Sequence, residues 1–135
     1  AGAEPPSRPP APSKPGVPAR RVNLVVGKVG KRLARPEVDA QLAAVKPAVE
    51  ACYQLPDCSR DTGYQCIDPR QESRLSFRIF IGTDGKVVKM HRGGGGIPLA
   101  QCLPKAFERM RFSPYERESG EEYSEIGLHL VLEGS

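Results

Sequence analysis

The sequence predicts a small α+β domain in which two helices pack on one face of a small antiparallel sheet. Apolar residues alternate with a period of two in three segments, as they do in half-buried strands, and a turn signal after the second predicts a fourth strand as its hairpin partner. Two other segments carry apolar stripes with helical spacing, and the order along the chain is strand, helix, hairpin, helix, strand. The 135-residue chain has four cysteines and few aromatic side chains, so we also expect disulfides to staple a thin core.

Residues 1–20 are predicted to be a disordered, proline-rich linker that precedes one domain over residues 21–135. Seven of the fourteen prolines lie in residues 1–18, among Ala, Ser, Gly and Lys. Such a segment buries too little apolar surface to fold, and it favours extended polyproline II structure. A spacer is the favoured interpretation, and docking to a proline-recognition module is the alternative.

The positive charge of the chain belongs to its amino-terminal part. Residues 1–35 hold eight basic residues and one acid, whereas residues 36–135 hold twelve basic residues and fifteen acids. A basic tail can contact nucleic acid, anionic lipid or an acidic polymer, but we favour a solvated tether and expect no nucleic-acid partner. No apolar run approaches the ~20 residues of a membrane span. The chain begins with Ala1 and not with a methionine, so we expect a processed or truncated piece of a longer protein.

The first strand and the first helix follow the linker. Residues 21–29 alternate as a strand does, with Val22, Leu24 and Val26 on one face. A helix is expected from about residue 36 to 54, because Pro36 suits a first helical turn. Pro47 falls inside this helix and is expected either to kink it or to split it. Its apolar stripe consists of Val38, Leu42, Val45, Val49 and Cys52.

A loop over residues 55–71 leads to the predicted hairpin. Residues 72–81 form the clearest strand, and Asp84-Gly85 provides the turn to a partner strand over residues 86–92. The four glycines of residues 93–96 then lead into Pro98 and a second helix. Its buried stripe is expected to contain Leu99, Leu103, Ala106 and Met110. A last strand over residues 123–133 directs Ile126, Leu128, Leu130 and Leu132 to the core.

The four cysteines are best explained as two disulfides. Cys52 ends the first helix and Cys102 lies in the second, so packing both helices on one sheet can bring the two together. Cys58 and Cys66 share a loop and can close a local ring, and we predict the pairs 52–102 and 58–66. A zinc site would need pairs spaced C-x2-4-C, and a thioredoxin-like centre would need C-x-x-C, but the sequence contains neither.

No set of residues predicts an active site, a cofactor or a metal ion. The glycines of residues 93–96 could cradle a phosphate, but the flanking residues of the known phosphate motifs are missing, and a flexible connection is favoured. The histidines, His91 and His129, are expected to point outward from strands. The acids between residues 116 and 125 lack a partner set for acid/base catalysis, so a solvated surface is expected.

From Lys31 to Leu132 the chain resembles the TonB carboxy-terminal domain superfamily, and within it the cysteine-containing AgmX/PglI domains of bacterial envelope and gliding-motility proteins. The motifs that carry the resemblance are Gly30-Lys31, residues 49–53, residues 75–79, residues 81–87, Cys102, and residues 107–114. The resemblance implies that Cys52 and Cys102 match the family's cysteine pair. It also implies a parent protein that is anchored upstream of residue 1 and crosses the periplasm.

The function expected from these features is a non-catalytic protein-interaction module of the periplasm or cell envelope, in an energy-transducing or gliding-motility assembly. TonB itself binds a receptor by adding a strand to its sheet, and an exposed sheet edge could bind an extended partner segment in the same way. We expect the last strand to be this edge, with the outward residues Glu125, Gly127, His129 and Val131 facing an envelope or outer-membrane protein. The extra pair Cys58/Cys66 and the charged last strand depart from the TonB pattern, so the receptor itself is not implied.

A peptidoglycan- or glycan-binding domain is the alternative from a different class. It would need polar and aromatic side chains gathered in a groove. The tyrosines available for such a groove are Tyr53, Tyr64, Tyr115 and Tyr123.

Overall fold

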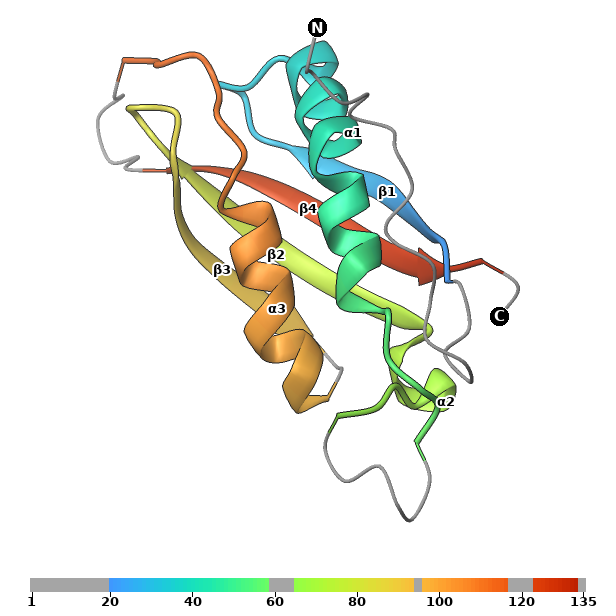
Figure 1. Cartoon of the computed structure of the whole chain (residues 1–135). Coiled ribbons are helices and arrows are strands. Elements are labelled where there is room, and N and C mark those ends of the chain that lie inside the picture. The colour runs from blue at the N-terminus through green and yellow to red at the C-terminus, as the bar shows by residue number, and fades with distance from the viewer. Residues whose placement is uncertain (1–19, 59–64, 94–95, 117–122, 134–135) are drawn as a thin grey trace, which may run out of the picture.

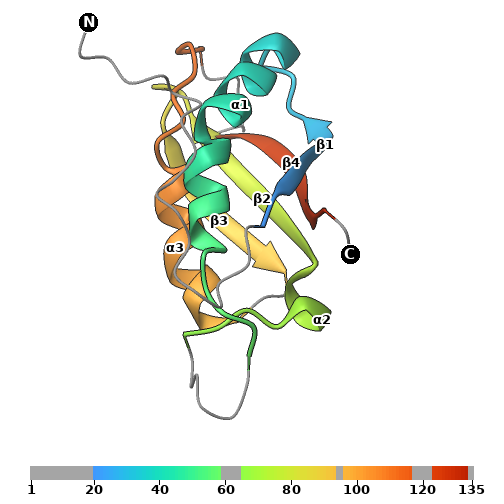
Figure 2. The same cartoon turned by 45° about the vertical axis from the view of Figure 1, so that its right-hand side comes forward.

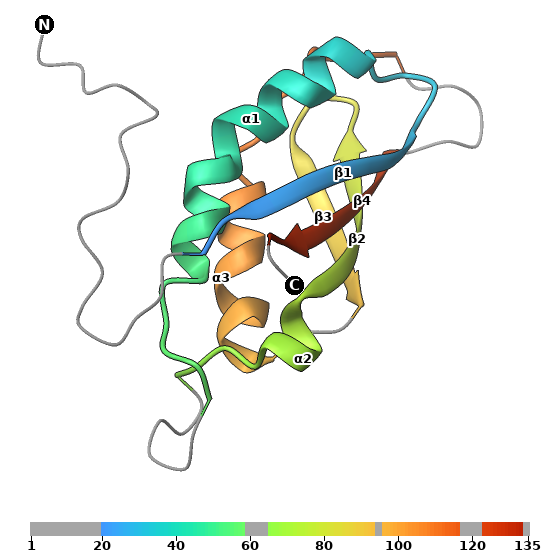
Figure 3. The ribbon, with the colours of Figure 1, turned by 90° about the vertical axis from the view of Figure 1, so that its right-hand side faces the viewer.

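The computed structural model describes residues 20–58, 65–93, 96–116 and 123–133. Within them the chain forms a four-stranded antiparallel sheet with two long helices on one face, so the predicted fold class is confirmed (Figures 1 and 3). The predicted linker lies outside the described residues except for Arg20. The elements are β1 (Val22–Val29), α1 (Arg35–Cys52), α2 (Pro69–Glu72), β2 (Arg74–Gly82), β3 (Val87–Gly93), α3 (Ile97–Phe107) and β4 (Tyr123–Leu132).

The strands are arranged in the order β1-β4-β2-β3, and every neighbouring pair is antiparallel. Strands β1 and β2, which α1 connects, are therefore parallel to each other and separated by β4. Strands β3 and β4, which α3 connects, are likewise separated by β2. The fold thus consists of two interleaved strand–helix–strand units, and β1 and β3 form the two edges of the sheet (Figure 2).

The core lies between the sheet and the two long helices. The predicted inward residues of β4 are at most 5% exposed, and those of β2 at most 2%. The Phe77 ring of β2 packs on Phe107 of α3 with their centres 5.2 Å apart. On the first strand Val22 is fully buried, and a bulge at Gly27 shifts the register so that Val29 returns to the core side.

Helix α1 continues through Pro47 without a break, and it buries the five residues of the predicted stripe. Pro36 lies in its first turn, as predicted. Helix α3 ends at Phe107, so Met110 is buried in the segment that follows the helix and not within it. Asp84-Gly85 forms the predicted turn, with Gly85 at a φ of 84°. A Cβ atom at Gly85 would lie 1.9 Å from the Phe112 carbonyl oxygen, so glycine is required there.

Both predicted disulfides are present. Cys52 at the end of α1 is bonded to Cys102 of α3 with an S–S distance of 2.05 Å, and Cys58 is bonded to Cys66 with an S–S distance of 2.11 Å. The first disulfide ties the two long helices together, and the second closes a loop. That loop continues into the short helix α2, which the sequence analysis assigned to loop and strand. The Asp68 carboxylate caps α2 by accepting a hydrogen bond from the Arg70 N–H at 3.0 Å.

Candidate functional site

The prediction that the last strand is an exposed edge is wrong. Strand β4 is hydrogen-bonded to β1 on one side and to β2 on the other, so its backbone is not available to a partner strand. His129 lies opposite Val25 of β1 and Ser76 of β2, and a proline there would remove a hydrogen bond within the sheet. The predicted residues Glu125, Gly127, His129 and Val131 point instead to the face of the sheet that carries no helix.

The outer side of β1 is an edge with backbone groups turned toward solvent. In an antiparallel ladder the backbone groups of successive residues point alternately to the two sides. The Glu133 N–H donates to the Arg21 carbonyl at 2.9 Å, which fixes the residues that face β4. The Val22 N–H points the other way and donates to the Glu50 carboxylate of α1 at 2.9 Å. The same alternation turns the N–H and C=O groups of two more residues to the outer edge, Leu24 and Val26.

Residues of β1 and α1 line a groove of about 580 Å³ beside this edge. Figure 3 shows the positions of the two elements on the sheet. Its volume lies within the usual range for ligand sites in proteins, ~300–1,000 Å³. One wall is formed by residues 23–26 of β1. The other wall is a stripe along α1 that consists of Arg35, Asp39, Leu42, Ala43 and Lys46. A groove of this form, with a strand edge as one wall and a helix as the other, suits an extended peptide.

The lining of the groove is mixed in character. Leu24 and Val26 are half-buried and supply apolar surface, while the small side chain of Ala43 leaves room above them. Arg35 and Asp39 form an exposed ion pair at 3.0 Å across one turn of α1. The α1 wall thus offers polar groups and the β1 wall offers apolar groups. An extended peptide can use both, because its successive side chains point to opposite sides.

The other edge of the sheet, β3, has a different surface. Its outward side chains include the exposed residues Lys89 and His91, and Val88 forms a bulge in the register with β2. Charged side chains and bulges on an edge strand oppose pairing with another chain. Strand β1 also has a bulge, at Gly27, but residues 23–26 before it are uncharged, pair regularly with β4 and line the groove, so β1 is the better candidate for binding.

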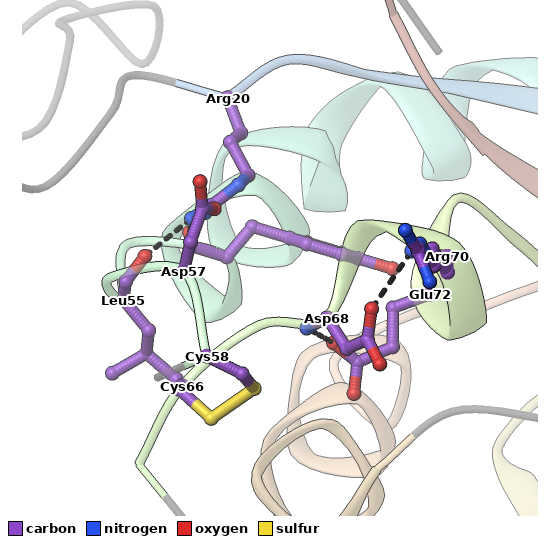
Figure 4. A network of polar contacts seen from close by, with 9 residues as sticks. Arg20, Leu55, Asp57, Cys58, Cys66, Asp68, Arg70 and Glu72 are labelled. Carbon is purple, nitrogen blue, oxygen red and sulfur yellow. Dashed lines mark hydrogen bonds and ion pairs between the residues drawn. A yellow bond between two sulfur atoms is a disulfide. The ribbon is translucent and has the colours of Figure 1, made fainter. Parts of the chain in front are cut away.

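A polar network fixes the chain where it enters β1 (Figure 4). The Arg20 guanidinium donates to the carbonyl oxygens of Tyr53, at 2.6 Å, and of Leu55, and it pairs with the Asp57 carboxylate. The Arg20 side chain is only 9% exposed. The segment that it grips follows α1 and leads into the Cys58–Cys66 ring. The entrance to the edge strand is therefore attached to the end of the helix that forms the other wall of the groove.

A buried carboxylate holds the start of α3. Glu72 is 2% exposed and accepts hydrogen bonds from the Gly96 N–H at 2.8 Å and from the Asp68 N–H at 2.7 Å. Burial raises the pKa of the Tyr53 hydroxyl far above its usual value, and the negative charge of Glu72 adds to this effect. These contacts anchor α2 to α3, and they are structural in character.

The three described tyrosines among those considered for glycan binding do not gather in one groove. Tyr53 is fully buried, and the Tyr115 hydroxyl donates to the Ile81 carbonyl at 2.5 Å. Tyr123 is 41% exposed on the helix-free face, and Tyr64 lies outside the described residues. The described part of the chain contains no cluster of three or more His, Cys, Asp or Glu side chains that could hold a metal ion. None of its helices is long and apolar enough to cross a bilayer.

The groove residues on α1 were not identified by sequence analysis, which treated that helix only through its buried stripe. A signal was present, since Arg35, Asp39, Ala43 and Lys46 follow each other at helical spacing on one side of the helix. These four residues can be recognised as a groove wall only when the strand that lies beside α1 is known. Comparisons of the chain with protein-family models, with curated proteins and with solved structures gave no match.

Proposed function

We propose that this chain is a non-catalytic protein-interaction module of a bacterial cell envelope, and that it binds an extended segment of a partner by strand addition to β1. The observation that carries the proposal is the groove beside the outer edge of β1, with the backbone groups of Leu24 and Val26 turned toward it. A strand that enters the groove would pair with these groups, while its alternate side chains contact α1.

The cysteines and the resemblance support the proposed cellular location. All four cysteines are paired, and disulfides persist in oxidising compartments such as the bacterial periplasm. The resemblance to the TonB carboxy-terminal superfamily supports an envelope role in an energy-transducing or motility assembly. The partner class is an envelope or outer-membrane protein.

Filling the groove tests the proposal. Peptides that bind the full chain would first be selected from a random displayed library. Ala43→Trp places a large side chain in the groove, and we expect it to weaken peptide binding by at least about tenfold, or ~1.4 kcal/mol, in titration calorimetry. Ala44→Trp is the matched control, because Ala44 is an equally exposed alanine of α1 that does not line the groove.

Both variants should melt at the temperature of the wild-type chain, since neither alanine is buried. The proposal is contradicted if the selection yields no binding peptide, or if the selected peptides bind Ala43→Trp as tightly as Ala44→Trp.

A further inference from the structure

The face of the sheet that carries no helix has a concentrated positive charge. The outward residues of the four strands include one carboxylate, Glu125, and four cations, which are Lys28, Arg74, Arg78 and Lys89. Over the predicted domain, residues 21–135, seventeen basic residues and fifteen acids nearly balance. The strands thus place four of the domain's cations on one surface, and we call this surface the cationic face.

Aromatic rings hold the centre of the cationic face in place. The ring of Phe80 lies 5.5 Å from His91 and 6.2 Å from Tyr123, measured between ring centres. The Lys89 ammonium is 4.8 Å from the centre of the Phe80 ring and 5.3 Å from that of Tyr123. An ammonium held over two rings loses little freedom when it pairs with an anion, so binding costs less entropy.

Glu125, the carboxylate that the strands place on this face, is already neutralised. Arg78 donates two hydrogen bonds to Glu125, each of 3.0 Å, and its guanidinium carbon also lies 5.3 Å from the Phe80 ring centre. The hydrogen bonds from Arg78 lower the pKa of the Glu125 carboxyl. Glu125 therefore does not offset the charge of the other cations, and the face as a whole is complementary to an anionic partner.

We propose that the cationic face binds an acidic polypeptide segment, independently of the groove beside β1. Side chains two residues apart on a strand are separated by about 6.6 Å, and an extended acidic peptide has the same repeat. Lys89 and His91 on β3 have this spacing, and Arg74 and Arg78 lie on the adjacent strand β2. Single-stranded nucleic acid fits less well, because it stacks its bases on free aromatic rings and the Phe80 ring is covered by the chain's own cations.

The test uses the full chain and a synthetic oligoglutamate peptide, with an oligoglutamine peptide of equal length as the neutral control. We expect oligoglutamate alone to bind, with an affinity that falls as salt is added. Lys89→Glu should weaken binding by at least about tenfold, whereas Lys105→Glu, an equal charge change at an exposed residue of α3, should weaken it by less than about threefold. Phe80→Leu keeps the charge and removes the supporting ring, so a loss of about threefold is expected.

Amide chemical shifts would locate the binding. The proposal requires oligoglutamate to shift residues of β2, β3 and β4, and it is overturned if the shifts are confined to residues 1–35. Equal weakening by Lys89→Glu and Lys105→Glu would overturn it as well, because net charge alone would then account for binding. Tighter binding of oligothymidylate, or of anionic phosphatidylglycerol vesicles, at the same residues would show that the polypeptide assignment is wrong.

Discussion

The two edges of the sheet differ in what they offer to a neighbouring chain. Strand β1 faces a groove walled by α1, and its exposed apolar residue Val25 is 49% accessible. Strand β3 carries Lys89 and His91 on its outward side and is bulged at Val88. Both edges carry a bulge, at Gly27 in β1 and at Val88 in β3, and Val88 is 47% exposed. The edges differ in the charged residues beside the β3 bulge and in the uncharged residues 23–26 of β1 that line the groove, and this difference indicates that β1 is the edge kept available for pairing.

The disulfide between the helices supports both edges, since it ties α1 beside β1 to α3 beside β3. Cys52 and Cys102 are 50 residues apart, so the loop-entropy estimate gives a loss of about 4 kcal/mol for replacing both by serine. Replacing Cys58 and Cys66, which are 8 residues apart, should cost less, about 2.5 kcal/mol by the same relation. Urea denaturation of the two double variants measures both values. Equal losses would mean that the loop is as important to the core as the link between the helices.

On the β3 side, the connection to α3 depends on Glu72. Glu72→Ala leaves the N–H groups of Gly96 and Asp68 without this acceptor, and we expect a loss of about 2 kcal/mol in the free energy of unfolding. Glu72→Gln keeps one acceptor oxygen and should lose less. If the free energy of unfolding of Glu72→Ala equals that of the wild-type chain, the buried carboxylate does not anchor α3.

Moving a charge from one edge to the other should reverse which edge pairs with another chain. Lys89→Val removes a charge from β3, and Val25→Lys adds one to β1. We expect Lys89→Val to self-associate more than the wild-type chain in sedimentation velocity, because an unprotected edge can pair with a second copy. Val25→Lys should not increase self-association, and it should lower the affinity of the chain for the peptides selected to bind the groove. Greater self-association of Val25→Lys would reverse the assignment of the two edges.

The smallest effect is expected at the ion pair on the cationic face. Because Arg78 lowers the pKa of Glu125 below 4.5, the pair contributes stability above the unfolded pKa, and this contribution is lost as the pH falls through the folded pKa. Glu125→Gln lacks the carboxylate, so its stability should fall less steeply than that of the wild-type chain below pH 4.5. Parallel acid-denaturation curves for the two chains would contradict this.

The sequence contains enough information for the elements and the disulfides, but not for the strand order. The apolar alternation of Ile126, Leu128, Leu130 and Leu132 predicts a strand with one buried face, and central and edge strands share that pattern. Polar outward residues such as Glu125 and His129 occur both on edge strands and on the solvent-facing side of central strands. In the fold these side chains lie on the helix-free face, and the neighbours of β4 are set by the crossings through α1 and α3.

The contacts that shape the site join residues that are distant in the sequence. Arg20 contacts Tyr53 across 33 positions, and Glu72 contacts Gly96 across 24. No local periodicity marks such pairs, because in the sequence alone Arg20 and Glu72 resemble ordinary exposed charged residues. They become visible only when the packing of α1 and α3 on the sheet is known.

Backbone hydrogen exchange tests the central claim most directly. The amides of Leu24 and Val26 face the groove, so a peptide that adds to β1 should slow their exchange with solvent while the amides of β3 exchange as before. The measurement compares the full chain alone and with a saturating concentration of a selected peptide. Slower exchange at Leu24 and Val26 is the result that the account predicts. Unchanged exchange at both residues, or protection along β3 instead, would contradict strand addition at β1.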